Sequence, residues 1–136
     1  MSANSTTVGA GQKGVATVLI IEDDPGATTV FKQILTMNGY DVYVAPDAES
    51  GLLEVQRVNP SAVLLDLHLP MADGVEFLRQ LRESVPAARM PIAVVTGDYF
   101  VEEAVAEELQ QLGAQVHFKP LWEDDLLRLV HGLLDR

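Results

Sequence analysis

Hydrophobic residues follow two alternating patterns along the chain. Short uninterrupted apolar runs are typical of strands buried on both faces. They alternate with segments in which apolar residues recur every three or four positions, as on one face of a helix. The runs predict strands at residues 18–21, 40–45, 62–66, 92–95 and 116–118. The periodic segments predict helices at residues 25–38, 48–59, 77–85, 101–112 and 126–133.

Residues with special backbone chemistry mark where several of these helices begin and end. Asp24 followed by Pro25 predicts a helix start, because an Asp side chain caps free backbone amides and Pro fits the first helical position. Gly39 and Gly113 predict helix ends. The apolar face of the first predicted helix consists of Ala27, Val30, Phe31, Ile34 and Leu35.

Five strand–helix units in succession predict a parallel sheet with helices on both faces and right-handed crossovers. The runs at 18–21, 62–66 and 92–95 are continuously apolar, so we expect these strands in the interior of the sheet. The runs at 40–45 and 116–118 are mixed and should form its edges. Both expectations are met by the strand order 2-1-3-4-5, which is the flavodoxin-like, doubly wound α/β fold.

The composition limits which classes of protein the chain can belong to. Its 136 residues suffice for one domain, and a hydrophobic content of 48% excludes general disorder. The formal net charge of −11 argues against direct binding to nucleic acid. The absence of cysteine excludes disulfides and thiolate metal sites, and no apolar run reaches the roughly 20 residues that span a membrane.

The first residues differ in character from the rest of the chain. Residues 1–16 are rich in Ser, Thr, Gly and Ala and show no periodicity, so we interpret them as a flexible N-terminal tail. They also lack the apolar core of a signal peptide, which favours a cytoplasmic location. The predicted domain therefore covers residues 17–136.

Polar side chains stand where four of the predicted strands end. Glu22 and Asp23 follow the first strand, Asp66 ends the third, Thr96 closes the fourth and Lys119 closes the fifth. The carboxyl ends of parallel strands share one edge of the sheet, where open α/β folds bind their ligands. We therefore expect these five side chains to converge on one shallow pocket.

The expected pocket has a specific chemistry. Three crowded carboxylates repel one another and resist full ionisation, and a bound cation removes that cost. Carboxylates and waters are ligands suited to Mg²⁺. With that cation, the ammonium of Lys119 and the hydroxyl of Thr96 would suit a phosphoryl group. Asp66 could itself be the nucleophile, because carboxylates form aspartyl-phosphates.

The chain resembles the receiver domain of two-component response regulators, of which the chemotaxis-type single domain is the simplest member. The resemblance covers about residues 17–134. The motifs that carry it are VLIIEDDP at 18–25, LDLHLPMADG at 65–74, VVTG at 94–97 and FKP at 118–120. Each motif is weak alone, but all four occur in order and at the expected strand ends.

The resemblance implies a role for each residue of the pocket. Asp66 would accept a phosphoryl group from a histidine kinase or a histidine phosphotransfer protein. Glu22 and Asp23 correspond to the acidic pair that serves Mg²⁺, and Asp23 is favoured as the direct ligand. The backbone carbonyl of His68 would complete the protein's ligands. Finally, Thr96 and Lys119 would hold the phosphoryl oxygens.

The same resemblance predicts a signalling domain that promotes its own phosphorylation and dephosphorylation but is not an enzyme. Its downstream protein target would bind the face made by the fourth helix, fifth strand and fifth helix. The apolar strip expected there contains Trp122, Leu127 and Leu134, beside an acidic row on the fourth helix, although burial against the sheet is an equal expectation for the two leucines. Such a face favours a basic, partly apolar partner. The family usually has an aromatic residue three positions before the lysine, where this chain has Val116.

Three other functions use related features. A flavodoxin-like FMN carrier would bind phosphate after the first strand, where the acidic residues 22–24 repel it. A haloacid-dehalogenase-type phosphatase needs a second Asp two positions after its nucleophile, which here is His68, and its nucleophile follows the first strand. A pseudo-receiver that serves only as a protein contact would lack a complete site. Receiver function remains the favoured interpretation.

Overall fold

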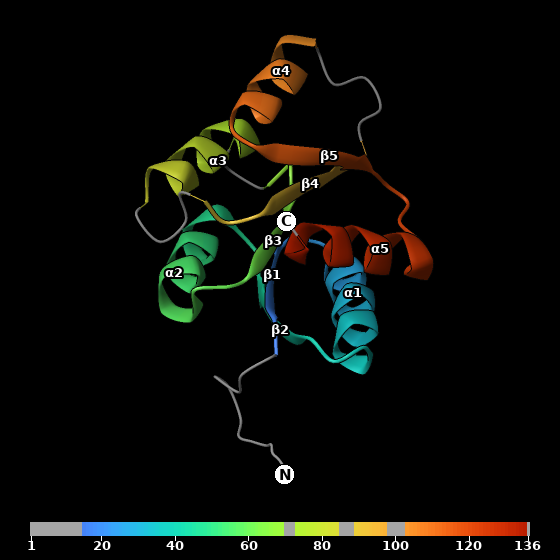
Figure 1. The fold of residues 1–136 in the computed structure, drawn as a ribbon. Coiled ribbons are helices and arrows are strands. Elements are labelled where there is room, and N and C mark those ends of the chain that lie inside the picture. The colour runs from blue at the N-terminus through green and yellow to red at the C-terminus, as the bar shows by residue number, and fades with distance from the viewer. Residues whose placement is uncertain (1–14, 70–72, 85–88, 98–102, 136) are drawn as a thin grey trace.

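A five-stranded parallel sheet in the order β2-β1-β3-β4-β5 forms the centre of the molecule (Figure 1). The computed structural model describes residues 15–69, 73–84, 89–97 and 103–135. The strands are β1 (Thr17–Ile21), β2 (Asp41–Ala45), β3 (Ala62–Asp66), β4 (Ile92–Thr96) and β5 (Ala114–Phe118). The helices are α1 (Pro25–Met37), α2 (Ala48–Val58), α3 (Gly74–Glu83), α4 (Glu103–Gln111) and α5 (Glu123–Leu134). The predicted flavodoxin-like fold and strand order are confirmed.

Strand burial follows the hydrophobic pattern of the sequence. Every residue of β3 and β4 is buried, and so are four of the five residues of β1. The edge strands β2 and β5 are only partly buried. The continuously apolar runs are therefore the interior strands, because only an interior position hides both faces and both edges of a strand.

The helices cover the two faces of the sheet as separate layers (Figure 1). Side chains from α2, α3 and α4 pack on one face around Leu19 and Leu65, and those from α1 and α5 pack on the other around Ile20 and Leu64. Successive strand residues alternate between these two cores, as the pleat of a strand requires. None of the helices in the described part of the chain is long and apolar enough to cross a membrane.

Local capping explains where the helices start. The Asp24 side chain accepts a hydrogen bond from the backbone N–H of Gly26 at 3.0 Å, so the predicted cap of α1 is confirmed. The carboxylate of Asp73 caps α3 by accepting from Val75 at 2.9 Å. Gly113 follows α4 with a φ of 78°, the left-handed conformation that ends a helix.

Several details differ from the prediction, including the starts of α3 at Gly74 and of α5 at Glu123, each three residues earlier than expected. Val30 was expected on the buried face of α1 but is 53% exposed, since the face that packs on the sheet is centred on Phe31 and Leu35. The fifth strand begins at Ala114, two residues before its predicted start, because Ala114 pairs with Ile92 of β4.

Other predictions fall partly outside the described residues. The third helix ends at Glu83, before its predicted end at Val85, and Val85 lies outside the described residues. Val101, the predicted start of the fourth helix, also lies outside them. So does most of the predicted tail at 1–16, which stays a prediction.

Candidate functional site

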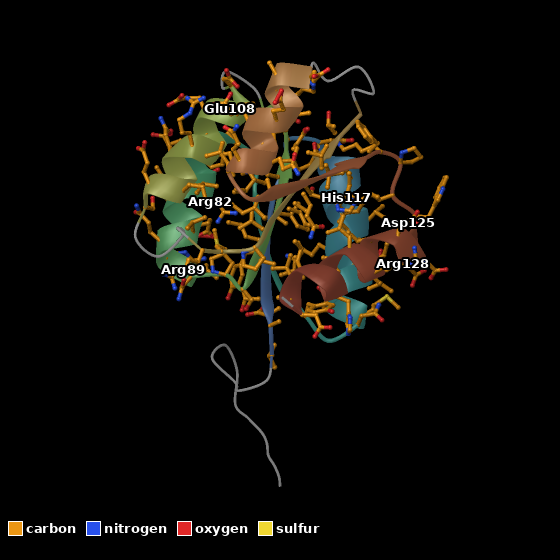
Figure 2. The ribbon with its side chains drawn as sticks, turned by 45° about the horizontal axis from the view of Figure 1, so that its top comes forward. Arg82, Arg89, Glu108, His117, Asp125 and Arg128 are labelled. Atoms are coloured by element: carbon orange, nitrogen blue, oxygen red, sulfur yellow. The ribbon has the colours of Figure 1, made fainter. Side chains whose placement is uncertain are left out.

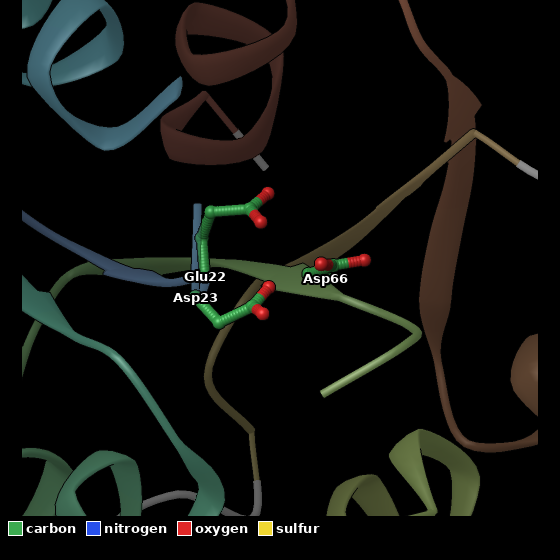
Figure 3. Close-up of side chains that lie close together, drawn as sticks. All are labelled: Glu22, Asp23 and Asp66. Carbon is green, nitrogen blue, oxygen red and sulfur yellow. The ribbon is translucent and has the colours of Figure 1, made fainter. Parts of the chain in front are cut away.

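Three carboxylates meet at the carboxyl edge of the sheet (Figure 3). Asp66 ends β3, while Glu22 and Asp23 directly follow β1, the strand that pairs with it. One oxygen from each of these three side chains lies within 4.8 Å of the other two. Glu22 and Asp66 are only 5% and 8% exposed, whereas Asp23 is exposed. The cluster therefore combines two buried acids with one that faces solvent.

Backbone hydrogen bonds orient the two buried carboxylates. The N–H of Glu22 donates to Ala45 at 3.0 Å, which extends the pairing of β1 and β2 by one residue. The carboxylate of Glu22 accepts from the N–H of Asp24 at 3.2 Å, and that of Asp66 accepts from the N–H of His68 at 3.1 Å. Each acid is thus held by the turn that follows its own strand.

Lys119 directly follows β5 and reaches the same cluster with its side chain. Its backbone N–H donates to the carbonyl of Thr96 at 2.8 Å, so the pairing of β4 with β5 continues beyond Phe118. Its Nζ lies 2.8 Å from Oε1 of Glu22 and 4.0 Å from Oδ2 of Asp66. The lysine therefore contacts both buried acids.

Thr96 and His68 lie at the same edge of the sheet as this cluster. Thr96 is the last residue of β4 and is fully buried, and Val95 before it pairs with Asp66 in the sheet. His68 lies two residues after Asp66 with its side chain exposed. The structure thus brings together Glu22, Asp23, Asp66 and Lys119, with Thr96 at the end of β4 and His68 two residues after β3.

The charges of this site are unbalanced. Burial raises the pKa of Glu22, and the nearby Asp66 raises it further, although Lys119 opposes both effects. Burial acts to lower the pKa of Lys119, but its hydrogen bond with Glu22 and the charge of Asp66 raise it overall. One ammonium thus faces three carboxylates, and a cation in the site would relieve the remaining repulsion.

The donor atoms fit Mg²⁺. They are carboxylate oxygens, the hard ligands that this ion prefers, and there are few enough for it to keep several of its waters. The structure shows no cysteine or imidazole among the clustered ligands, which would favour a softer transition metal.

Two features of the site were missed from the sequence. The Glu22–Lys119 ion pair joins residues 97 positions apart, and no local signal announces it. The other is Gly74, where an added Cβ would lie 2.1 Å from the carbonyl oxygen of Leu67. Only glycine allows the start of α3 to approach the loop after Asp66 so closely. The glycine in LPMADG was the available signal for this contact.

The structure distinguishes between the two expectations for the apolar residues near α5. Trp122 is 70% exposed and Phe118 is 41% exposed. In contrast, Leu127 and Leu134 are half-buried against the core between the sheet and α1 and α5. The exposed apolar surface near α5 is therefore aromatic, and the two leucines contribute mainly to the core.

Comparison with known proteins identifies the class. The family model of the response regulator receiver domain matches residues 18–131, so the chain belongs to this family of two-component signalling domains. Receiver domains of this family are signalling domains. The resemblance inferred from the four sequence motifs is thereby confirmed.

Among individual relatives, the chain is 33% identical over 122 residues to the transcriptional regulatory protein TrcR of Mycobacterium tuberculosis, covering 88% of this chain and 45% of that protein. It is 35% identical over 120 residues to the response regulator MprA of Mycobacterium leprae, covering 88% and 51%. The chain thus spans about half the length of the curated relatives it matches.

Solved structures agree in fold. The CheY-like receiver domain protein of Methanospirillum hungatei JF-1 superimposes with a TM-score of 0.81 at 29% identity, covering 90% of this chain and 95% of that one. The receiver domain of sensor histidine kinase PA1611 from Pseudomonas aeruginosa PAO1 gives 0.79 at 26% identity, covering 90% and 100%. That structure has a magnesium ion coordinated in its active-site cleft.

Proposed function

We propose that Asp66 is the phosphoryl acceptor of this receiver domain. The observation that carries the proposal is the approach of Lys119 Nζ to 4.0 Å from Asp66 Oδ2, within a cluster of carboxylates that a divalent cation would neutralise. A carboxylate oxygen of Asp66 attacks the phosphorus of a phosphohistidine. The new O–P bond forms as the N–P bond to the donor's imidazole breaks.

The surrounding residues would position and stabilise the transferred group. Glu22, Asp23 and Asp66, with the backbone carbonyl of His68, would hold Mg²⁺, which neutralises charge on the phosphoryl oxygens when bound. Lys119 would donate to one phosphoryl oxygen after leaving Glu22, and the hydroxyl of Thr96 would donate to another. Burial of Asp66 keeps competing water away from its carboxylate.

Mass spectrometry after incubation with acetyl phosphate and Mg²⁺ tests the assignment. The wild type should gain one phosphoryl group, the adduct should be lost in hydroxylamine as an acyl phosphate is, and EDTA should suppress it. Asp66→Asn should abolish it. Asp124→Asn removes an equally charged but exposed residue of α5 and should leave it unchanged. An unaltered adduct in Asp66→Asn refutes the acceptor assignment.

The partners follow from the same site and from the surface near it. The phosphoryl donor would be a histidine kinase or a histidine phosphotransfer protein, the donor class expected for this family. The signal would leave through the face of α4, β5 and α5. There Phe118 and Trp122 are exposed, the acidic first turn of α5 directly follows Trp122, and α4 carries further acidic residues, which suits a basic partner protein with apolar side chains. Direct nucleic-acid binding by this domain is disfavoured by its net charge of −11.

Amide chemical-shift mapping with beryllofluoride, which mimics the aspartyl-phosphate, tests this output route. Changes should extend from the loops around Asp66 into the described residues 103–134. With Val116 in place of an aromatic residue before Lys119, we expect the largest changes near the start of α4. Changes confined to the loops around Asp66 contradict the route through this face.

A further inference from the structure

Helix α4 is held by few buried side chains. Of its described residues, only Leu109 is fully buried, whereas Val105 is partly buried and Glu103 is exposed. The fully buried contact, Leu109, lies in the second half of the helix, while the partly buried Val105 in the first turn and Leu112 just beyond the helix pack on the same core. Among the described residues, the fully buried packing of α4 therefore lies toward its C-terminal end.

Arg82 adds a polar attachment at that same end (Figure 2). It lies in the last turn of α3, and its Nε donates to the carbonyl of Leu112 at 2.7 Å. Its Nη2 reaches the carbonyl of Gly113 at 3.4 Å, and its Nη1 donates to the carbonyl of Met90 at 2.6 Å. One guanidinium thus joins α3 to the end of α4 and to the segment that enters β4.

The position suits an arginine for two physical reasons. The sequence of α4, Glu103–Gln111, contains no basic residue, so Arg82 brings the positive charge that favours the carbonyl end of a helix dipole. A guanidinium also has donors fixed in one plane, which can serve several carbonyls at once, whereas a lysine has a single nitrogen.

A second link between α3 and α4 has a different character. Arg79 pairs with Glu76 of its own helix and with Glu108 of α4. All three side chains are between 38% and 51% exposed, so solvent screens the link to Glu108. The Arg79–Glu108 pair links α3 to the middle of α4. The half-buried Arg82 is therefore the stronger polar anchor between the two helices.

The opposite end of α4 follows the candidate site in the chain. Thr96 ends β4 in contact distance of the Lys119 backbone, and α4 begins seven residues later at Glu103. A change at the phosphoryl group would therefore reach α4 at its N-terminal end, while packing and Arg82 hold the other end.

We propose that Arg82 is a positioning residue that makes α4 a lever pivoting at its C-terminal end. This proposal rests on the proposed function of Asp66, because phosphorylation of Asp66 would cause the movement of α4. With Arg82 present, rearrangement at Thr96 displaces the first turns of α4 and leaves Leu112 and Gly113 in place. Without Arg82, the displacement spreads along the whole of α4, so the change at the output face is no longer confined to the first turns of the helix.

Residue-resolved hydrogen exchange of the unphosphorylated protein tests the anchor without relying on phosphorylation. In Arg82→Ala, amides at 109–113 should exchange about tenfold faster or more, as expected for losing hydrogen bonds from a charged donor. Arg82→Lys keeps the charge and the fold but lacks the planar fork, and should still exchange faster than wild type. Arg79→Ala removes the same charge from the same helix, and should change these amides by less than about twofold. Equal effects of Arg82→Lys and Arg79→Ala overturn the anchor.

Beryllofluoride shift mapping on the same variants tests the lever. In the wild type, shifts should be large at 103–105 and small at 112–113, and in both Arg82 variants they should spread to 112–113. Unchanged shift patterns in those variants, together with faster exchange, assign Arg82 a purely structural role and overturn the lever. A wild type without any response refutes the proposed function instead, and the exchange result then still decides the anchor.

Discussion

Removing the charge of Asp23 should stabilise the metal-free protein. Its carboxylate oxygen lies within 4.8 Å of an oxygen of both Glu22 and Asp66, so two like charges act on it. A pair at about 4 Å is worth about 1 kcal/mol in water and about 4 kcal/mol near a protein surface. Asp23 is exposed, which places each repulsion toward the lower value, and Lys119 offsets part of it.

We therefore expect Asp23→Asn to raise the free energy of unfolding by about 1 kcal/mol in EDTA. This change corresponds to a rise of roughly 3–6 °C in the melting temperature. Mg²⁺ that binds only the folded state adds about 2.7 kcal/mol at about a hundred times its Kd. If Asp23 is a ligand, its loss weakens Mg²⁺ affinity, and each tenfold loss removes about 1.4 kcal/mol of that gain. The substitution should therefore stabilise the metal-free protein and reduce its response to Mg²⁺.

Thermal unfolding followed by circular dichroism over a Mg²⁺ titration measures both effects. Glu107→Gln is the matched control, because Glu107 is an exposed acid of α4 outside the carboxylate cluster. This control should retain the wild-type response to Mg²⁺. An Asp23→Asn protein that is no more stable in EDTA and responds to Mg²⁺ like wild type refutes both the repulsion and the ligand role.

Three further outcomes test the structure. Gly74→Ala should lose about 1–3 kcal/mol or more in urea unfolding, because its Cβ would overlap the carbonyl oxygen of Leu67. Leu35→Ala should lose about 2–5 kcal/mol and Val30→Ala less than about 0.5 kcal/mol, and similar losses would contradict the burial described for α1. Burial raises the pKa of Glu22 above 4.5, so its ionisation disfavours the folded state. In metal-free urea unfolding, the stability of wild type relative to Glu22→Gln should fall as pH rises from 4.5 through the raised pKa and then level off.

The sequence determined the strands and their order. Whether a strand lies inside a parallel sheet depends on its own apolar content, so the runs at 18–21, 62–66 and 92–95 were sufficient to place β1, β3 and β4 in the interior. The sequence also predicted that the acids and the lysine lie at one edge of the sheet, because the carboxyl ends of parallel strands share that edge. The cap at Asp24 was equally readable, because it involves residues only two positions apart.

Periodicity alone was less reliable for individual side chains. The spacing of apolar residues in α1 predicts an apolar face that includes Val30, but which part of that face meets the sheet depends on how the helix is rotated against it. Leu127 and Trp122 show the same limit at α5, where packing decided that the leucine is half-buried and the tryptophan exposed.

Only the tertiary structure decided the contacts between distant segments. The sequence predicted that Lys119 would bind a phosphoryl oxygen. It did not predict the pairing of Lys119 with Glu22, which lies 97 positions away. Likewise, the hydrogen bond from Arg82 to Leu112 spans 30 positions, and no periodic pattern in the sequence indicates it. The sequence could determine which strands are interior and where α1 is capped, because these depend on a residue and its near neighbours. These long-range contacts depend on how whole elements lie against one another, which is settled only when the chain has packed.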